Sequence, residues 1–486
     1  MDPGAGWHLT DILTATGGRP STLDGPRRLT AVSTDTRNLP PGAVFVALRG
    51  RNHDGHRFVA EAIHLGASAA IVEAGAGVSV GAGAAVEGGA AVEGGATVER
   101  GAASGPATLI EVPDTLRALG DLAAYHRRRH RLRVAAITGS NGKTTTKEMV
   151  ASIMAKAIGP ERLLSTRGTE NNLIGVPLTL LRACGRETVA VLELGMNAPG
   201  EIWRLTEIAD PDVGAVTCVG PAHIEGLGSI EGVARAKGEL YARLRSNAVA
   251  VVNNEDERVR EIAGAFAGPT IRFGRGGEVS AEDVVLVGTD GIAFTLVADG
   301  ERRPVRVPLP GVHNVMNALA ATAIARTLGA TLDAVVAGLA ALPPLPMRMQ
   351  VVTLPGDITV INDAYNANPA SMRSALAMLR ATGTGARIAV LGEMRELGSE
   401  SVALHRQVGL TAAEQGVGLL VVMGPEAEAM RAGALEGGMA PDAAVIVASH
   451  AEAASQVRRH LRPGDCLLIK GSRGARMEEV LERLRA

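Results

Sequence analysis

Residues 134–147 constrain the fold of this chain more than any other stretch. Four small or apolar residues suited to a buried parallel strand run into a glycine-rich turn, then into a lysine and three threonines, and then into a helix-compatible segment that reaches Ala157. In such a unit the N–H groups of the turn and the helix N-terminus face an anion. The lysine can reach the outer phosphates and the first threonine can bind Mg²⁺. We therefore expect a phosphate-binding loop on a parallel sheet.

The loop is shorter than the common P-loop. The pattern G-x-x-x-x-G-K-[ST] would place its first glycine at Ile137, whereas this chain reads G-x-x-G-K-T-T from Gly139. The alternative is an ordinary glycine turn with a surface lysine. Strand, short glycine loop, lysine and hydroxyls together favour nucleotide binding. The expected nucleotide contacts are Gly139, Ser140, Asn141, Gly142, Lys143, Thr144 and Thr145.

Length and composition indicate a large globular α/β protein. A chain of 486 residues predicts about three domains. Hydrophobic residues make up 46% but aromatic residues only 2%, so the cores must be built from Val, Leu, Ile and Ala, which suits helices packed on parallel sheets. The net charge of -2 does not indicate binding to nucleic acid or to an anionic membrane. No apolar run reaches the roughly 18 residues of a membrane span, and the N-terminus lacks a signal peptide pattern, so we expect a cytoplasmic protein.

Two smaller features have unremarkable expected roles. Cys184, Cys218 and Cys466 lie far apart without metal-ligand spacing, and we expect core residues in a reducing compartment. The basic run at residues 127–131 is expected to be a solvated helix end, with anion binding as the alternative.

Residues 1–112 are expected to form a small α/β module. Short apolar runs at 43–48 and 69–72 predict strands, with a helix between them. Around the first strand lie two loops, at 32–37 and 48–56. Hydroxyls with an arginine on a turn can hold a diphosphate, although the same residues also suit a turn with an exposed arginine.

Residues 74–105 consist mainly of Gly, Ala, Val and Glu and contain a six-residue repeat. Hexapeptide repeats can coil into a parallel β-helix, but three copies cannot bury a core. We expect a flexible surface insertion. Deleting residues 76–104 should leave activity nearly intact.

The rest of the chain alternates between apolar runs and helix-compatible segments. Runs at 189–195, 213–219 and 248–253 are each followed by a turn, which predicts a doubly wound, mostly parallel sheet with ligands at the carboxyl ends of its strands. The prolines at 343–346 end this region. The predicted fold is α/β with three domains: residues 1–112, 113–343 and 344–486, the last again a Rossmann-like sheet.

Three polar residues outside the loop are candidates for chemistry. Glu193 ends a predicted strand, where a carboxylate can bind the Mg²⁺ that bridges nucleotide phosphates, although a lone glutamate there is more often a surface residue. His223 follows another strand and could equally be an ordinary loop histidine. Lys237 lies on a predicted helix, where a lysine is ordinarily solvated.

These residues resemble the Mur ligase family of ATP-dependent amide-bond synthetases. The resemblance covers essentially the whole chain except residues 74–105. Further motifs are similar to the branch that joins D-alanyl-D-alanine to a UDP-N-acetylmuramoyl-tripeptide, and the Asn-Pro-Arg turn of the branch that adds the third residue is absent. The family motifs lie at 138–146, Glu193, 221–223, 236–239 and 313–317, and the branch motifs at 33–37, 54–56, 169–177, 363–369, 392–398 and 470–477.

The resemblance implies a reaction and its partners. ATP phosphorylates the terminal carboxylate of the UDP-linked tripeptide, and the amine of D-alanyl-D-alanine attacks the acyl phosphate. The N-terminal module would bind the UDP-sugar, and the third domain would close over ATP and bind the dipeptide. We expect a monomer. The alternatives are another Mur-type ligase with a different acceptor, or a P-loop NTPase switch or kinase of another class.

The resemblance also implies roles for single residues. Lys143, Lys237 and His223 would be catalytic. Thr144 and Glu193 would hold one Mg²⁺ and His223 a second, while Lys237 matches a lysine that can carry a metal-binding carbamate.

The remaining implied contacts concern the nucleotide and the peptide. Asn314 and Asn317 match contacts to the nucleotide base, although Asn314 could instead cap a helix. Met347 stands where related ligases often have histidine, so no histidine role is implied there. The third domain would reach ATP through Arg348 and Asp363, the tripeptide would lie near Asn171 and Asn172, and the UDP side would be formed by Ser33, Thr34, Arg37, Asp54 and His56.

Overall fold

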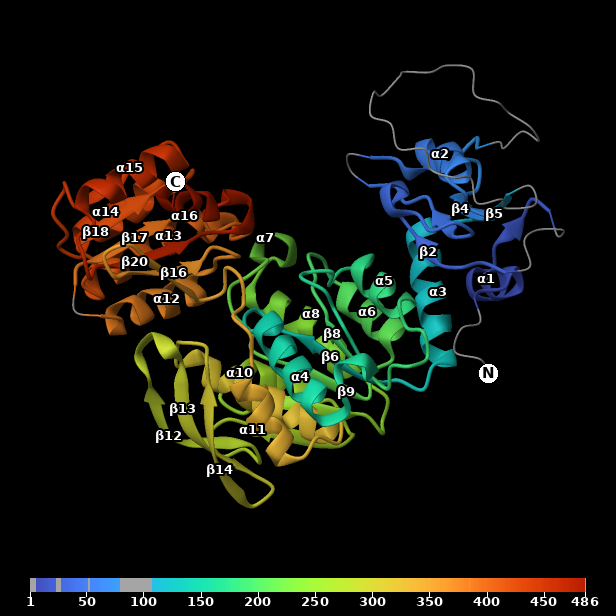
Figure 1. Cartoon of the computed structure of the whole chain (residues 1–486), viewed down its shortest axis with the longest axis horizontal. Coiled ribbons are helices and arrows are strands. Elements are labelled where there is room, and N and C mark those ends of the chain that lie inside the picture. The colour runs from blue at the N-terminus through green and yellow to red at the C-terminus, as the bar shows by residue number, and fades with distance from the viewer. Residues whose placement is uncertain (1–5, 23–27, 51–52, 79–106, 384, 486) are drawn as a thin grey trace. The chain divides into compact units, whose positions relative to one another are not determined.

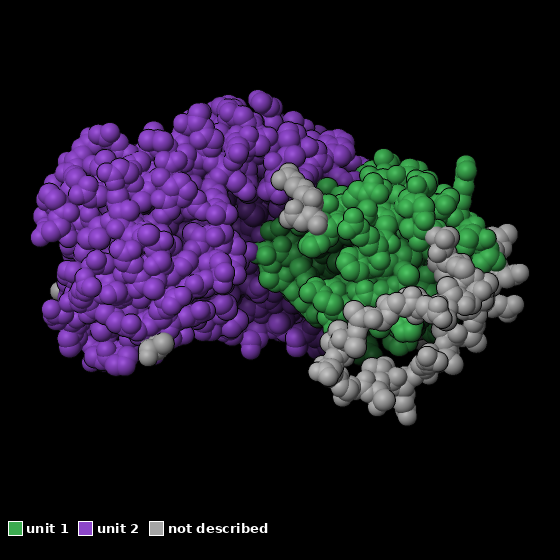
Figure 2. Space-filling view, turned by 90° about the horizontal axis from the view of Figure 1, so that it is seen from above, with its two compact units in different colours: residues 1–133, 164–190, 207–210 green, residues 134–163, 191–206, 211–486 purple. Residues whose placement is uncertain are grey.

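The computed structural model describes residues 6–22, 28–50, 53–78, 107–383 and 385–485 (Figure 1). Most of the repeat insertion predicted at 74–105 therefore lies outside the described residues. Within the chain the contacts define two compact units, coloured separately in Figure 2. Unit 1 comprises residues 1–133, 164–190 and 207–210, and unit 2 comprises residues 134–163, 191–206 and 211–486.

Unit 1 is built on a five-stranded sheet of order β1-β5-β4-β3-β2. Its strands β2 to β5 run parallel, and β1 is antiparallel to β5. The strands are β1 (Arg19–Pro20), β2 (Val32–Ser33), β3 (Val44–Val46), β4 (Ala69–Glu73) and β5 (Thr108–Val112), and the helices are α1 (Leu9–Thr16), α2 (Val59–His64), α3 (Thr115–Arg129) and α5 (Gly175–Leu181).

Helices cover both faces of this sheet because the side chains of its strands point alternately to either side. Ile71 packs on one face with Ile12 of α1 and Leu119 of α3, whereas Ala70 packs on the other face with Val59 of α2. The helix α3 begins at the N-cap Asp114, whose carboxylate accepts the N–H of Arg117.

The basic run at the end of α3 is solvated as predicted at Arg128, Arg129 and Arg131, which are exposed, but not at Arg127. The guanidinium of Arg127 is buried and donates to the carbonyls of Ala209 and Asp210 at 3.1 and 3.2 Å. Arg129 forms an ion pair with Asp11 at 2.8 Å. These arginines satisfy carbonyl and carboxylate groups within unit 1, a tertiary role that a charge run does not reveal.

Unit 2 carries the strand that leads into the phosphate loop. The six-stranded sheet has the order β11-β10-β9-β6-β8-β7, and β6, β9, β10 and β11 pair in parallel. The strands are β6 (Arg133–Thr138), β7 (Leu163–Ser165), β8 (Val189–Glu193), β9 (Val213–Val216), β10 (Val249–Asn253) and β11 (Thr270–Phe273). Residue 133 of β6, residues 164–165 of β7 and residues 189–190 of β8 are counted in unit 1.

Helices and a small antiparallel sheet accompany these strands. In Figure 1, α4 lies beside α10 and α11, and the three pack together. A bulge at Glu282–Val285 interrupts the register of the small sheet. The helices are α4 (Lys143–Ile158), α6 (Glu201–Ala209), α7 (Ile224–Leu227), α8 (Ile230–Arg243), α9 (Glu257–Ala263), α10 (His313–Thr327) and α11 (Leu332–Ala340), and the sheet contains β12 (Ser280–Leu286), β13 (Ile292–Ala298) and β14 (Glu301–Val307).

The C-terminal part of unit 2, residues 344–486, has its own six-stranded sheet of order β15-β16-β20-β17-β18-β19. All neighbours are parallel except β15, which is antiparallel to β16. The elements are β15 (Gln350–Leu354), β16 (Ile358–Asp363), α12 (Pro369–Ala381), β17 (Arg387–Leu391), α13 (Ser401–Glu414), β18 (Leu419–Val422), α14 (Ala427–Glu436), β19 (Ala444–Ile446), α15 (His450–His460), β20 (Cys466–Lys470) and α16 (Glu478–Arg485).

The predicted α/β class with mostly parallel sheets is confirmed. Four sheets are described, one in residues 1–112, two in residues 113–343 and one in residues 344–486, while the domain boundaries at 112/113 and 343/344 stay a prediction. The core assignment of the cysteines is wrong for Cys184, which is exposed, whereas Cys466 is buried. Among the described residues, no helix combines the length and apolarity needed to cross a membrane.

Candidate nucleotide site

The phosphate loop follows β6 as predicted and ends where α4 begins at Lys143. Gly139 and Gly142 have φ of 147° and 80°, a region that favours glycine. A Cβ on Gly139 would lie 1.9 Å from the hydroxyl of Thr217, and one on Gly142 would lie 2.2 Å from the Oδ1 of Asn317. Both glycines are therefore required by conformation and by close approach.

Side chains from behind the loop hold its backbone in place. The hydroxyl of Thr217 donates to the carbonyl of Asn141 at 2.5 Å. Ser140 donates through Oγ to the carbonyl of Gly220 and accepts the N–H of the same residue, each at 2.9 Å. These bonds come from the protein itself and hold the loop backbone, which lowers the cost of ordering it on binding.

Lys143 folds back over the loop, where its Nζ donates to the carbonyl of Gly139 at 2.7 Å. Burial lowers the pKa of Lys143, while the charge of Glu193 acts in the opposite direction. A cation held at this point can neutralise phosphate oxygens placed against the loop.

Thr144, Glu193 and Arg348 meet at the first turn of α4. The hydroxyl of Thr144 donates to Glu193 Oε2 at 2.6 Å and accepts from Arg348 Nη2 at 2.8 Å. The guanidinium of Arg348 also lies over the ring of Tyr365, 3.9 Å from its centroid. The flanking Met347 and Met349 both have positive φ, so the backbone that presents this arginine is strained.

Lys237 lies on α8 with only 1% of its surface exposed. Burial lowers its pKa well below the ordinary value, and the positive charge of Lys143 acts in the same direction. The lowered pKa favours the neutral form of the Lys237 amine. The sequence alone favoured a solvated lysine, and that reading is wrong.

His223 lies in a left-handed conformation, with φ of 60°, at the start of α7. Its Nδ1 lies against the carboxylate of Glu396, which also has positive φ, and the carbonyl of Glu396 accepts the N–H of Glu225 at 3.2 Å. The hydrogen bond from His223 lowers the pKa of Glu396 against the effect of burial. The predicted histidine is thus paired with a carboxylate from the C-terminal part.

Asn314 and Asn317 share the buried side of the first turn of α10. Asn314 Nδ2 donates to the carbonyl of Pro310 at 2.7 Å, and Asn317 Nδ2 donates to Asn314 Oδ1 at 2.8 Å. The alternative role of Asn314 as N-cap is wrong, because Val312 occupies that position and no side chain caps the helix. Asn317 instead adjoins Gly142, so the pair is connected to the loop.

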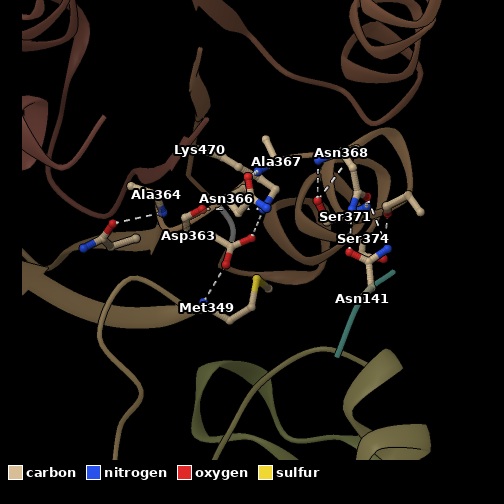
Figure 3. A network of polar contacts seen from close by, with 12 residues as sticks. Asn141, Met349, Asp363, Ala364, Asn366, Ala367, Asn368, Ser371, Ser374 and Lys470 are labelled. Carbon is tan, nitrogen blue, oxygen red and sulfur yellow. Dashed lines mark hydrogen bonds and ion pairs between the residues drawn. The ribbon is translucent and has the colours of Figure 1, made fainter. Parts of the chain in front are cut away.

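Asp363 lies at the carboxyl end of β16, within the polar network of Figure 3. Its carboxylate forms an ion pair with the buried Lys470 and accepts the N–H of Met349 at 3.0 Å. Lys470 also donates to the carbonyl of Asn366 at 2.9 Å. Asp363 is therefore engaged within the C-terminal part and fixes the backbone next to Arg348.

In unit 1, the predicted UDP loop at 32–37 is ordered by its own side chains. Ser33 Oγ donates to the carbonyl of Asp35 and accepts its N–H, at 3.0 and 3.2 Å. Hydrogen bonds from Arg37 lower the pKa of Asp35 to about 2. The guanidinium of Arg37 remains largely exposed, as an anion-binding arginine requires, and Thr34 lies between these residues.

The other predicted substrate residues of unit 1 also form local bonds. His56 is buried, with Nδ1 donating to Asp54 at 2.6 Å and Nε2 accepting the N–H of Glu73 at 2.9 Å. Asn172 Oδ1 accepts the N–H of Gly175 at 2.9 Å and so orders the turn that begins α5, next to Asn171. Both ring nitrogens of His56 are thus occupied by protein groups.

The structure brings two of the predicted metal ligands, Thr144 and Glu193, into contact. Mg²⁺ usually keeps several waters and takes one or two protein oxygens plus substrate phosphates, a set that Thr144 and Glu193 match beside the loop. In the described part of the chain, no three His, Cys, Asp or Glu side chains form a group suited to a metal.

No role was predicted for several residues of the site, although Asn368, Glu396 and Lys470 lie within the branch motifs at 363–369, 392–398 and 470–477. Lys470 ends a buried strand as Glu193 does, so the rule that strand ends carry ligands could have found it. Asn368 and Glu396 reach the loop region from more than 170 residues away, and only the tertiary fold brings them there. Thr217 gave no signal, since a threonine beside a strand is common.

A glycine loop at the end of a parallel strand, with a lysine, a Thr–Glu pair and an arginine around it, is typical of nucleoside-triphosphate-binding α/β enzymes. The chain belongs to the Mur ligase family. Residues 28–127 match the Mur ligase family catalytic domain, residues 137–325 the Mur ligase middle domain, and residues 347–473 the Mur ligase glutamate ligase domain.

Individual relatives extend over nearly the whole chain. The UDP-N-acetylmuramoyl-tripeptide–D-alanyl-D-alanine ligase of Escherichia coli K12 is 36% identical, over 98% of this chain and 97% of the relative. The ligase of that name from Mycobacterium tuberculosis H37Rv is 38% identical, over 94% and 92%. Among solved structures, MurF from Acinetobacter baumannii matches with a TM-score of 0.85 at 32% identity over 99% of both chains. MurF ligase from Thermotoga maritima in complex with ADP matches with a TM-score of 0.78 at 27% identity, over 94% of this chain and 97% of that one.

Proposed function

We propose that this chain is an ATP-dependent ligase that joins D-alanyl-D-alanine to UDP-N-acetylmuramoyl-tripeptide, a step of peptidoglycan precursor synthesis. The observation that carries this proposal is the near full-length similarity to the Escherichia coli and Mycobacterium tuberculosis ligases of that name. The phosphate loop supports ATP as the phosphoryl donor, because Lys143 lies over the loop and Arg348 donates to Thr144 at its end.

In the first step, a carboxylate oxygen of the tripeptide attacks the γ-phosphorus of ATP. The bond from that phosphorus to the oxygen of ADP breaks, and an acyl phosphate and ADP result. Two anions must approach each other, so positive charge is needed around the transferred group. Lys143 supplies it from the loop, and Arg348 supplies it from the C-terminal part.

In the second step, the amine of D-alanyl-D-alanine attacks the carbonyl carbon of the acyl phosphate. The carbon–oxygen bond to phosphate breaks, inorganic phosphate leaves, and the nitrogen gives up its proton as the amide forms. Water competes for the acyl phosphate, so the site must exclude it. Closure of the C-terminal part, residues 344–486, over ATP would provide that exclusion, and the same part would bind the dipeptide.

Thr144 and Glu193 would hold the Mg²⁺ of the ATP complex. When bound, the ion supplies Lewis-acid polarisation of the phosphoryl oxygens. His223 and Lys237 would serve a second ion once Lys237 carries a carbamate. Only a neutral amine adds CO₂, and the lowered pKa of Lys237 favours that form.

Residues 1–112 would bind the UDP-sugar through the exposed Arg37 and the loop at 48–56. Residues 113–343 would bind ATP. Because UDP-linked precursors and ATP are cytoplasmic metabolites, the proposed reaction places the protein in the cytoplasm.

Phosphate release from ATP tests this function. We expect release only when UDP-N-acetylmuramoyl-tripeptide and D-alanyl-D-alanine are both present, with the amide product seen by mass spectrometry. Release that depends on the UDP-peptide but on a different amine would indicate another Mur-type ligase. Release with ATP alone, unchanged by either peptide, would indicate an NTPase switch and contradict the proposal.

A further inference from the structure

The phosphate loop is joined to the C-terminal part by a pair of side-chain amides. Asn368 Nδ2 donates to Asn141 Oδ1 at 2.7 Å, and Asn141 Nδ2 donates to Asn368 Oδ1 at 3.2 Å (Figure 3). The two residues are 227 positions apart. Each side-chain amide has an NH₂ donor group and an oxygen acceptor in one plane, so each residue donates to the other and accepts from it.

Asn368 is held rigidly on its own side of this pair. It is the N-cap of α12, where its Oδ1 accepts the N–H of Ser371 at 2.9 Å and its own N–H donates to Ser371 Oγ at 3.0 Å. Only 6% of its surface is exposed. This capping box fixes the Asn368 side chain in the orientation that meets Asn141.

The backbone that leads to Asn368 is anchored as well. The buried Lys470, at the end of β20, binds the carboxylate of Asp363 and donates to the carbonyl of Asn366. The position of Asn368 is therefore set by the C-terminal sheet. In the phosphate loop, the Thr217 hydroxyl donates to the carbonyl of Asn141 and so holds the loop backbone. The side chain of Asn141 is then in place to meet Asn368.

We propose that Asn368 is a positioning residue of the nucleotide site, which holds the phosphate loop through Asn141 and so links nucleotide binding to docking of the C-terminal part. By reciprocity, a nucleotide that favours the loop conformation in which Asn141 meets Asn368 stabilises the docking of α12, and docked α12 strengthens nucleotide binding. Because the role of the loop as an ATP site belongs to the proposed function, this linkage rests on that proposal.

A double-mutant cycle on the full chain tests the pair. Asn368→Ser keeps a good N-cap for α12 but is too short to reach Asn141, and Asn141→Ala removes the partner. Calorimetric titration with AMP-PNP and Mg²⁺ should show about tenfold weaker binding in each variant, because two hydrogen bonds are lost. The double variant should bind no more weakly than the single ones. Unchanged binding in Asn368→Ser, or multiplied losses in the double variant, would overturn the proposal.

Ser449→Ala is the matched control for destabilisation. Ser449 caps α15 in the same C-terminal part by accepting the N–H of Glu452 at 3.2 Å, and it belongs to neither amide of the pair. This variant should lower the melting temperature and leave AMP-PNP affinity unchanged. A tenfold loss of affinity here would show that simple destabilisation explains the effect, and would overturn the role of Asn368.

Hydrogen exchange provides a readout of the linkage itself. AMP-PNP should slow exchange of the Ser371 and Met372 amides in the wild-type chain, and Asn141→Ala should abolish that added protection. Equal protection in Asn141→Ala would contradict the linkage. If the wild-type chain binds AMP-PNP but never joins the two peptides, the ligase assignment is refuted. The role of Asn368 would still be decided by the AMP-PNP affinities of the double-mutant cycle.

Discussion

The Thr144 hydroxyl donates a 2.6 Å hydrogen bond to the Glu193 carboxylate, although the two residues lie 49 positions apart. Glu193 is almost fully buried at the end of β8. A buried carboxylate directed at the first turn after a phosphate loop is suited to a cation that bridges the protein and phosphate oxygens.

Glu193→Gln should lower turnover by several orders of magnitude and raise the Mg²⁺ concentration needed for half-maximal rate. The amide keeps the shape of the side chain but removes its charge. A steady-state Mg²⁺ titration measures both effects. Glu261→Gln, on the exposed side of α9, is the control and should behave as wild type. Normal Mg²⁺ dependence in Glu193→Gln would refute the assigned role.

Lys143→Ala should abolish measurable turnover while the fold is retained. The change removes the cation held against Gly139 and leaves the glycine conformations intact. Phosphate release and circular dichroism are the two measurements. Lys156→Ala, in the exposed last turn of the same helix, should keep both rate and spectrum. A Lys143→Ala enzyme with near-normal turnover would exclude this lysine from catalysis.

Lys237→Ala should lose turnover and regain part of it with added acetate or another short carboxylic acid. The acid would fill the place of the carbamate in the proposed second metal site. Lys143→Ala should gain nothing from the same acids, because there a cation is missing. If no carboxylic acid restores the turnover of Lys237→Ala, the carbamate is contradicted and Lys237 has an unmodified structural or electrostatic role.

The stability of unit 1 should fall as pH decreases below about 6.5. Burial lowers the pKa of His126 to about 4, and its Nε2 donates to the carbonyl of Ala183 at 2.8 Å. The unfolded chain therefore binds a proton between pH 6.5 and 4 that the folded chain does not, and stability is lost as pH falls. The expected loss from pH 7 to pH 5 is about 2 kcal/mol.

Urea unfolding at the two pH values, followed by fluorescence of Trp7 in a Trp203→Phe background, measures this loss. The indole of Trp7 stacks on His126 with ring centroids 4.8 Å apart. His126→Gln should remove most of the pH dependence, while the exposed His64→Gln should keep it. A pH dependence identical in His126→Gln and wild type would contradict the assignment.

The local unit around the phosphate loop could be predicted from sequence because strand, glycines, lysine and helix are contiguous. Both glycine conformations and the start of α4 follow from that short pattern. The same reasoning treated Lys237 and Arg127 as solvated, since the pattern of a helix does not reveal what packs on it. Both are buried, Arg127 against carbonyls and Lys237 beside Lys143.

The contacts from the C-terminal part were predicted only in part, because they depend on the meeting of distant segments. Arg348 was expected near ATP and does bind Thr144 beside the phosphate loop. Asp363 was expected to face ATP, yet its carboxylate binds Lys470, a residue of another strand. Asn314 was considered as a cap, but its side chain turns back to Pro310. In each case a tertiary partner competes with the role that the local sequence suggests.

The close approach of Gly139 and Thr217 limits how this loop can change. Any side chain at position 139 would collide with the very hydroxyl that secures the Asn141 carbonyl. Removing that hydroxyl would create space but release the loop. Position 139 therefore accepts only glycine without strain, because its φ of 147° disfavours other residues even where space is made. An inhibitor that depends on this corner of the loop would leave the enzyme few single substitutions by which to escape it.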